Sequence, residues 1–327
     1  MKRNKLTCWV IYDAKKIGTG NQCLGLASAL GFASPKTIEI SAHWPWRYLS
    51  SKLWLSPLKA VTIQDGATLT PPWPDVIIAA GRASAAPTAE IRRLSQYKTF
   101  VIQLQNPSLK PELFNIVVAP AHDRLKGKNV IVTKGALHQL KEENICQAAK
   151  NFEEQLSSLT RPFVAVLIGG TNKRYKLTPA VIASMAEQLK EMVKTYKVGL
   201  AITPSRRTES ENYKALQFHF KDFPVYIWDR QSENPYLAML ALAQTIIVTA
   251  DSVSMISEAC STGKPVYVFP LAGGSAMSRR FHTLFNKLGY TRPFVGILEN
   301  WSYKPLNDIS LVVEEIQKAL RDHLKTL

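Results

Sequence analysis

Short apolar runs rich in β-branched residues alternate with segments of helical periodicity along most of the chain, and this alternation restricts the possible folds more than any other feature. Strands that alternate with helices form parallel sheets covered by helices. The second half shows the pattern most cleanly. The strands expected there are Phe163–Ile168, Gly199–Thr203, Val225–Trp228, Thr245–Ala250 and Pro265–Phe269. The helices expected there are Pro179–Tyr196, Ser210–Phe218, Pro235–Ala243, Val253–Ser261 and Ile309–Leu324.

The first half repeats the pattern less regularly. Its expected strands are Cys8–Tyr12, Thr37–Ile40, Asp75–Ala80, Thr99–Leu104, Asn115–Ala119 and Asn129–Val132, with helices at Asn21–Leu30 and Ser84–Leu94. A chain of 327 residues is about twice the usual domain size. The sequence therefore predicts an α/β fold of two Rossmann-like domains that face a cleft.

The boundary between these domains is expected near Arg161-Pro162, after a polar helix close to Lys141–Leu159. This divides the chain into an N-terminal domain, residues 1–158, and a C-terminal domain, residues 159–327. The final helix could pack back on the N-terminal domain.

The chain is strongly basic, with 41 Lys and Arg against 25 Asp and Glu and a net charge of +16. Such a charge favours anionic partners, either phosphorylated small molecules or an anionic membrane surface. No recognised nucleic-acid module is visible, so no nucleic-acid partner is expected. The four cysteines are widely spaced, and no stretch is apolar enough to span a bilayer. These features predict a cytoplasmic protein, with peripheral binding to the cytosolic face of the inner membrane left open.

The strongest candidate site is the segment TADSVSMISEACSTGKP, in which a buried strand runs into a helix. Asp251, Ser252 and Ser254 are good helix-capping residues at the carboxyl end of that strand, where α/β sheets bind ligands. The free N–H groups of a helix start attract phosphate. Glu258 lies one turn after Ser254 and could accept hydrogen bonds from a ribose. Ordinary capping is the alternative interpretation of the two serines.

Two further strand ends in the same half carry glycine or basic residues, which suit a phosphate. Glycines let the backbone approach a phosphate, and lysine or arginine neutralises it. Three such junctions in one domain favour a phosphate site over solvated surface charge. The residues concerned are Gly169, Gly170, Lys173 and Arg174 after the first strand and Ser205, Arg206 and Arg207 after the second.

The first half has its own glycine-rich junction, DAKKIGTGNQ, with Gly18, Gly20 and Asn21. It matches neither G-x-G-x-x-G nor the Walker motif, which argues against a dinucleotide oxidoreductase and against ATP hydrolysis. Arg82 and Gln105 follow two other strands. These residues are expected to line the opposite wall of the cleft, on the acceptor side.

Transfer of a sugar with inversion needs a general base near the acceptor hydroxyl. His122, Asp123 and Asp13 are the candidates, each at a strand end. A structural role for His122 is an equally good interpretation, and His138 in TKGALH could also face the cleft. No clustered metal-ligand pattern and no D-x-D occur, so we expect no metal and no cofactor other than a nucleotide-sugar substrate.

One segment interrupts the alternation: HWPWRYLSSKLWLSPLKAV, residues 43–61. It mixes tryptophans and leucines with Arg47, Lys52 and Lys59, a composition that suits an acceptor cleft or a membrane interface. The alternative is a loop and helix that cover the N-terminal core.

Several stretches resemble the bacterial and plant family named for elongated mitochondria, whose plant member is a mitochondrial fission factor. They include GNQCLGLASALG, PDVIIAAGRASA, PAHDRLKGKNVIVTKGALH, VLIGGTNKRY, ITPSRRT, TADSVSMISEACSTGKPVYVF and RRFHTLFNKLG. The resemblance covers most of the chain and implies a GT-B-like fold.

A more distant resemblance links residues 249–265 to the lipid II N-acetylglucosaminyltransferase and related GT-B enzymes. It implies that Ser252, Ser254 and Glu258 hold a nucleotide's phosphates and ribose, with Gly169 and Gly170 at the first turn. The histidine in the N-terminal glycine loop of that enzyme has no counterpart in residues 18–22 of this chain.

These observations predict a metal-independent GT-B glycosyltransferase that moves a sugar from a nucleotide-sugar to an envelope or lipid-linked acceptor. The N-terminal domain would be the acceptor side, and the C-terminal domain would bind the nucleotide-sugar. The alternative is a non-catalytic protein with the same scaffold that binds membranes or protein partners in membrane remodelling.

Overall fold

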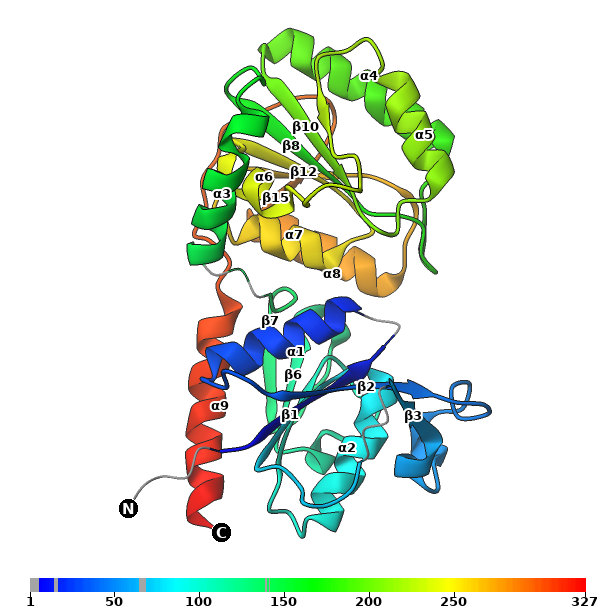
Figure 1. Ribbon diagram of the computed structural model, residues 1–327, viewed down its shortest axis with the longest axis vertical. Helices are drawn as coiled ribbons and strands as arrows, with labels where there is room; N and C mark the ends of the chain where they lie inside the picture. The colour runs from blue at the N-terminus through cyan, green and yellow to red at the C-terminus, as the bar shows by residue number, and fades with distance from the viewer. Residues whose placement is uncertain (1–5, 15–16, 65–68, 139, 141) are drawn as a thin grey trace. The chain divides into compact units, whose positions relative to one another are not determined.

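The structure is a computed structural model that describes residues 6–14, 17–64, 69–138, 140 and 142–327. The chain divides into two compact units (Figure 1). Unit 1 comprises Met1–Gln139 and Asn307–Leu327, and unit 2 comprises Leu140–Leu306.

The described part of unit 1 contains a seven-stranded sheet in the order β3-β2-β1-β4-β5-β6-β7. Its strands are parallel except β3, which pairs antiparallel with β2. The central strand β1 pairs with β2 on one side and β4 on the other, so the strand order reverses there. The bounds are β1 (Cys8–Asp13), β2 (Lys36–Ala42), β3 (Val61–Ile63), β4 (Val76–Ala80), β5 (Phe100–Leu104), β6 (Ile116–Pro120) and β7 (Val130–Thr133).

Helices cover both faces of this sheet, because both faces of its strands are apolar. Helices α1 and α9 pack on the face that holds Val10 and Ile78, and α2 packs on the face that holds Ile11 and Ile77. The bounds are α1 (Ile17–Ala29), α2 (Arg82–Leu94), α9 (Asp308–Lys325) and the short 3-10 helices η1 (Ser51–Leu53), η2 (Pro57–Ala60), η4 (Pro111–Leu113) and η5 (Ala121–Asp123).

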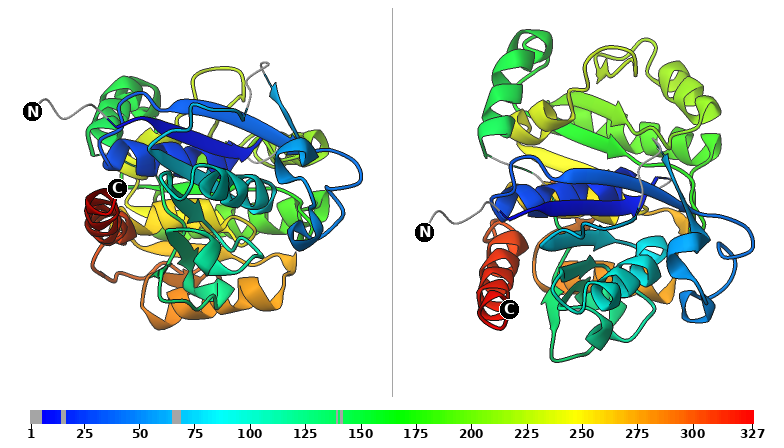
Figure 2. Two further views of the ribbon diagram at one scale, coloured as in Figure 1. Left: turned by 90° about the horizontal axis from the view of Figure 1, so that it is seen from below. Right: turned by 60° about the horizontal axis from the view of Figure 1, so that its bottom comes forward.

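Unit 2 is built on a parallel sheet in the order β11-β10-β8-β12-β13-β15. Figures 1 and 2 show α4 and α5 on one side of this sheet and α3 and α6 on the other. A short antiparallel pair, β9 with β14, lies apart from it. The strands are β8 (Phe163–Ile168), β9 (Tyr175–Lys176), β10 (Gly199–Pro204), β11 (Tyr226–Ile227), β12 (Thr245–Thr249), β13 (Val266–Phe269), β14 (Ala272–Gly273) and β15 (Thr291–Pro293). The helices are α3 (Glu142–Leu156), α4 (Pro179–Tyr196), α5 (Ser210–His219), α6 (Tyr236–Leu242), α7 (Val253–Cys260) and α8 (Ala276–Lys287).

The division between the units differs from the predicted boundary after residue 158. Helix α3 belongs to unit 2, because its Phe152 and Leu156 are buried in the same core as Met239 of α6. Helix α9 belongs to unit 1, where Val312 and Ile316 are fully buried against the sheet. The chain therefore crosses between the units at 139–140 and again at 306–307.

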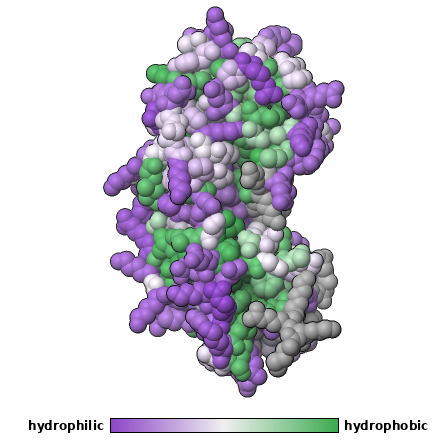
Figure 3. All heavy atoms as spheres, turned by 90° about the vertical axis from the view of Figure 1, so that its left-hand side faces the viewer, coloured by the Kyte–Doolittle hydropathy of each residue, from purple (hydrophilic) through white to green (hydrophobic). Residues whose placement is uncertain are grey.

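The α/β class predicted from the alternation is confirmed, and strand Phe163–Ile168 has the predicted bounds. Among the helices that the structure describes, none is both long and apolar enough to cross a membrane. Figure 3 shows hydrophilic side chains over much of the visible surface of both units, with hydrophobic patches between them.

Candidate functional site

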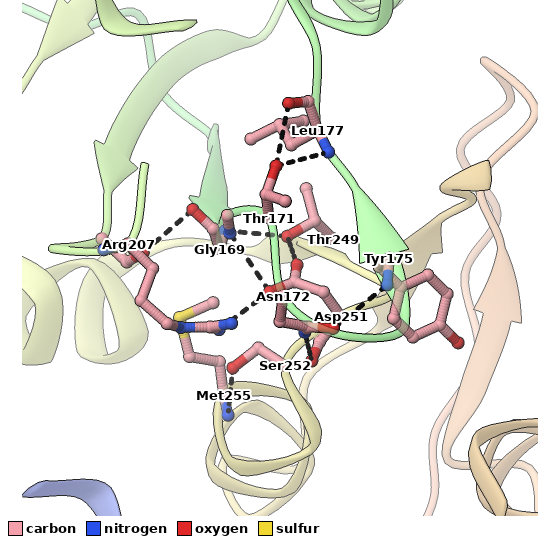
Figure 4. Close-up of polar contacts among 12 residues, drawn as sticks. Gly169, Thr171, Asn172, Tyr175, Leu177, Arg207, Thr249, Asp251, Ser252 and Met255 are labelled. Atoms are coloured by element: carbon pink, nitrogen blue, oxygen red, sulfur yellow. Dashed lines mark hydrogen bonds and ion pairs between the residues drawn. The ribbon is translucent and has the colours of Figure 1, made fainter. Parts of the chain in front are cut away.

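Three strand-end turns of unit 2 meet at one edge of its sheet. They follow β8, β10 and β12, which are neighbours in the sheet, so their carboxyl ends lie side by side. The Ser205 hydroxyl donates to the Gly169 carbonyl over 2.9 Å, and Gly169 N–H donates to the Thr249 hydroxyl over 2.8 Å. The turns expected to form one phosphate site are therefore joined directly by hydrogen bonds (Figure 4).

The carboxylate of Asp251 connects these turns. It accepts hydrogen bonds from Gly170 N–H at 3.1 Å, from the Thr249 hydroxyl at 2.6 Å and from Arg207 Nη2 at 2.8 Å. Its side chain is fully buried, whereas the side chain of Arg207 is half exposed. A carboxylate repels phosphate, so Asp251 is not placed as a phosphate ligand. It stabilises the turns through its hydrogen bonds.

The two glycines after β8 are required by this packing. A Cβ on Gly169 would lie 2.2 Å from the Asp251 carboxylate oxygens, and one on Gly170 would lie 2.0 Å from the Arg207 carbonyl oxygen. The sequence interpretation explained these glycines by close approach of a phosphate. The structure gives them a different reason, because protein atoms fill that space.

Helix α7 begins directly after Asp251. Ser252 is its N-cap, and the Ser252 hydroxyl accepts a long hydrogen bond of 3.5 Å from Met255 N–H. Ser254 lies in the first turn and is half-buried. The start of α7 therefore presents backbone N–H groups and two hydroxyls at the edge of the sheet.

The turns next to this helix start carry cationic side chains. Lys173, Arg174 and Arg206 are exposed, and Arg174 approaches Met277 at the start of α8. The Asn172 side chain accepts from the N–H groups of Arg174 and Tyr175 at 2.8 and 3.0 Å, which fixes the turn that carries these cations. The arrangement can bind a group with more than one negative charge.

Glu258 of α7 is half-buried and accepts a hydrogen bond from the hydroxyl of Tyr236 in α6. Burial raises the pKa of the Glu258 carboxyl to about 7, although the Tyr236 hydrogen bond acts in the opposite direction. The sequence motif indicates Glu258 but not Tyr236, because residues of two different helices meet only in the folded chain.

A cavity of about 230 Å³ lies beside the same turn and was not expected from the sequence. Tyr175, Ala250, Gly273 and His282 are among the residues that line it. His282 Nε2 lies 3.0 Å from the Ala250 carbonyl and 3.2 Å from the Tyr175 hydroxyl. Its Nδ1 atom is buried without a hydrogen-bond partner among the residues that the structure describes. Burial lowers the pKa of His282, which favours the neutral ring.

The candidates predicted in the first half gather at one edge of the unit 1 sheet. Asp13 is the last residue of β1, Arg82 and Gln105 come after β4 and β5, and His122 and Asp123 come after β6. These four strands are consecutive in the sheet. The arrangement repeats the one in unit 2, with a different set of side chains.

His122 and Asp123 form a close pair in η5. His122 Nε2 lies 3.9 Å from the Asp123 carboxylate, and both side chains are largely buried. Asp123 also accepts from Asn106 N–H at 3.3 Å. Asp13 is half-buried at the end of β1. A histidine beside a carboxylate suits a general base and equally suits a structural histidine.

The glycine-rich junction of the first half differs from the expected loop. Gly18, Gly20 and Asn21 already belong to the first turns of α1, so the helix begins before its predicted start at Asn21. Gly20 lies against the ring of Tyr12, and a Cβ there would be 2.6 Å from that ring. Lys15 and Lys16 of the same motif lie outside the described residues.

Arg82 and Gln105 have structural contacts. Arg82 donates to the Arg47 carbonyl over 2.9 Å, and Gln105 donates to the side chain of Gln22 in α1 over 3.3 Å. An acceptor-binding role for either residue stays a prediction. In the described part of the chain, no group of three or more His, Cys, Asp or Glu side chains could hold a metal ion.

Each unit is therefore a parallel sheet with helices on both faces and polar turns at its carboxyl edge, which defines the chain as a two-unit α/β protein of the GT-B type. Solved UDP-N-acetylglucosamine 2-epimerases share this fold. The putative enzyme from Listeria monocytogenes has a TM-score of 0.58 at 11% identity and covers 99% of this chain and 98% of its own. The enzyme from Methanocaldococcus jannaschii, in complex with UDP-GlcNAc and UDP, has a TM-score of 0.55 at 12% identity and covers 95% and 99%.

The chain belongs to the Mitochondrial fission ELM1 family, whose model matches residues 17–320. The Mitochondrial fission protein ELM1 of Arabidopsis thaliana is 32% identical over 274 residues, which are 76% of this chain and 64% of the plant protein. The chain thus spans less than two thirds of that relative. The Uncharacterized protein RP120 of Rickettsia prowazekii (strain Madrid E) is 28% identical, with 97% of this chain and 99% of that protein covered.

Proposed function

We propose that this protein is a metal-independent glycosyltransferase that takes a sugar from a nucleotide-sugar and transfers it to an envelope or lipid-linked acceptor. Unit 2 would bind the donor, and unit 1 would supply the acceptor site and the general base. The observation that carries the proposal is the meeting of three strand-end turns around the start of α7, with three exposed cations beside it.

The diphosphate of the donor would lie at the start of α7. Backbone N–H groups and the hydroxyls of Ser252 and Ser254 would donate hydrogen bonds to its oxygens there, and Arg206 and Lys173 would neutralise its charge. These groups stabilise the negative charge that grows on the leaving diphosphate as the sugar departs. Such stabilisation replaces the metal ion that other transferases use.

Glu258 would bind the ribose hydroxyls. Tyr236 holds one of its oxygens, which leaves lone pairs on the carboxylate for a ligand. Burial raises the pKa of this carboxyl group to about 7. Carboxyl groups with strongly shifted pKa values are concentrated at functional sites.

The sugar would occupy the cavity beside Ala250. Its volume of about 230 Å³ is adequate for a single sugar ring, and Tyr175 and His282 are among the polar residues that line it. The epimerase from Neisseria meningitidis, which has a TM-score of 0.53, was solved bound to UDP-GlcNAc, and this supports a nucleotide-sugar as the ligand class.

The acceptor hydroxyl would be deprotonated in unit 1. His122, which lies 3.9 Å from the Asp123 carboxylate, is the first choice for the base, and Asp13 is the second. The base takes the hydroxyl proton as the oxygen attacks the anomeric carbon, and the nucleoside diphosphate leaves with the electron pair of the broken bond.

A thermal-shift panel of nucleoside diphosphates and their sugars tests the donor site. We expect at least one of these ligands to raise the unfolding temperature, since a ligand that binds only the folded state stabilises it. Arg206→Ala and Glu258→Ala should abolish the shift. Lys150→Ala, an exposed substitution on α3, is the matched control and should retain it. No shift with any ligand in the panel would contradict the proposal.

Sugar transfer is tested by release of nucleoside diphosphate in the presence of a lipid extract. His122→Ala should reduce this rate by about 100-fold or more while the thermal shift persists, because general-base catalysis contributes about that factor. Nucleotide binding without any transfer would instead indicate a non-catalytic protein on the same scaffold.

A further inference from the structure

The aromatic segment between β2 and β3 of unit 1 contains both buried and exposed large side chains. Trp54 is only 6% exposed and packs with Ala60 in the core, and Trp46 is half-buried beside it, with 6.4 Å between the ring centroids. Trp46 and Trp54 therefore cover the core of unit 1, as one of the two interpretations of this segment predicted. They hold the segment on the unit and are not available to a partner.

The same segment exposes other large apolar side chains. Trp44 is 75% exposed, Tyr48 67%, Leu53 60% and Leu55 91%. All four lie within twelve positions of each other, whereas a soluble surface normally scatters such residues singly. We call these four residues, together with the cations described next, the aromatic-basic surface.

Cations are interleaved with these side chains. Arg47, Lys52 and Lys59 are all exposed, and the segment from residue 43 to residue 61 contains no Asp or Glu. The Arg47 guanidinium lies 4.5 Å from the ring centroid of Tyr48. The surface therefore combines a local charge of +3 with exposed apolar groups.

Hydrogen bonds hold the backbone of the segment in place. The two ring nitrogens of His43 contact the carbonyls of Trp44 at 2.9 Å and Lys59 at 2.6 Å, and Arg82 donates to the Arg47 carbonyl at 2.9 Å. A segment that is already ordered loses little conformational entropy when it binds. The exposed side chains are thus presented for contact by a fixed backbone.

We propose that the aromatic-basic surface docks unit 1 on a bilayer of anionic phospholipid. Trp and Tyr favour the headgroup level of a membrane, where one part of the ring is apolar and another is polar. Leu53 and Leu55 would enter the acyl region, and the three cations would lie against lipid phosphates. Charge complementarity selects the anionic bilayer, because the segment offers positive charge without any acidic side chain.

This inference does not rest on sugar transfer, since a membrane-docked protein need not be a transferase. The test uses the full chain and vesicles of phosphatidylcholine alone or mixed with phosphatidylglycerol. We expect co-sedimentation with the mixed vesicles and little with phosphatidylcholine. Added salt should weaken the binding, because it screens the lipid charge.

Variants separate this surface from the general charge of the protein. Lys52→Ala with Lys59→Ala should weaken binding by about fivefold for each lysine. The matched control is Lys126→Ala with Lys128→Ala, which removes the same charge from another exposed part of unit 1 and should have little effect. Trp44→Ala with Leu55→Ala should weaken binding about tenfold, whereas Leu113→Ala, an exposed apolar residue elsewhere, should not.

A spectroscopic measurement reports the contact itself. The fluorescence of Trp44, taken as the difference between the wild type and Trp44→Phe, should be quenched by brominated lipid chains in mixed vesicles. Absence of binding to mixed vesicles, equal losses in surface and control variants, or unquenched Trp44 would each overturn the proposal. Self-association through this surface in place of vesicle binding would also overturn it.

Discussion

At the scale of single residues, Asp251 shows how a polar side chain in a promising motif takes a structural role. Its carboxylate accepts three hydrogen bonds from Gly170, Arg207 and Thr249, and its side chain is fully buried, so a ligand does not reach it. Ser252 and Ser254 remain at the helix start beside it. The motif thus divides into Asp251, which joins the turns, Ser252, which caps the helix, and Ser254, which is half-buried in its first turn.

Glu258 leads to a prediction about pH. Its folded pKa of about 7 lies above the ordinary 4.5, so the folded state favours the protonated carboxyl. Ionisation of Glu258 therefore lowers the free energy of unfolding progressively as the pH rises from about 4.5 through about 7. The difference between the folded pKa and the ordinary pKa corresponds to a loss of roughly 3 kcal/mol in the free energy of unfolding at alkaline pH. Glu258→Gln, which stays neutral, should be more stable than the wild type at about pH 8.5 and similar to it at about pH 4.

Urea unfolding at the two pH values measures this effect. Glu153→Gln is the control, because Glu153 is exposed on α3 and its substitution should change little at either pH. An advantage of Glu258→Gln that is equally large at both pH values would refute the explanation.

At the scale of elements, the turns at the carboxyl edge of the unit 2 sheet pack tightly against one another. The turn after β8 passes so close to the turn after β10 that the Gly170 Cα faces the Arg207 carbonyl directly. Helix α7 starts where these turns meet. A small change of volume in one turn therefore displaces the others.

Gly170→Ala tests this coupling. The added Cβ would lie 2.0 Å from the Arg207 carbonyl oxygen, so one turn must move. We expect a loss of about 1–3 kcal/mol in the free energy of unfolding, as for other overpacked sites. Nucleotide binding should weaken as well, because the start of α7 shifts.

Gly18→Ala is the matched control, since a Cβ at Gly18 meets no atom within 4 Å and α1 tolerates alanine. Denaturant titration of both variants makes the comparison. Unfolding of Gly170→Ala at the wild-type midpoint would show that the turns are not in tight contact.

At the scale of the whole molecule, the chain passes from unit 1 to unit 2 and back again. The final helix completes unit 1, where Asp308 at its start accepts hydrogen bonds from Lys134 N–H at 2.6 Å and Gly135 N–H at 3.0 Å. Unit 2 is by contrast one continuous stretch of chain. A single continuous fragment of the chain can therefore contain the whole of unit 2 but not the whole of unit 1.

A fragment of residues 140–306 should fold alone, whereas a fragment of residues 159–306 should not. The shorter fragment lacks α3, whose Phe152 and Leu156 are buried against α6, and its loss exposes an apolar face of the core. Circular dichroism and cooperative thermal unfolding of both fragments provide the measurement. Cooperative unfolding of the shorter fragment would place the boundary where the sequence predicted it.

The sequence by itself determined the α/β class, most of the strands and the polar turns at their carboxyl ends. These features depend on periodicity and turn chemistry, which are local. Strand Phe163–Ile168 and the capping role of Ser252 are examples. The family resemblance stated from the motifs is confirmed by the match over residues 17–320.

Only the tertiary structure decided which side chains meet. It buried Trp54 and exposed Trp44 in one short segment, and it paired Tyr236 with Glu258. It placed α3 in unit 2, on the other side of the predicted boundary, and α9 in unit 1, the packing that the sequence had left open. Each of these outcomes depends on contacts between residues far apart in the chain or on the free energy of packing against a core. A local pattern carries no information on such contacts, and this is the physical reason why the partners of the site residues could not be predicted.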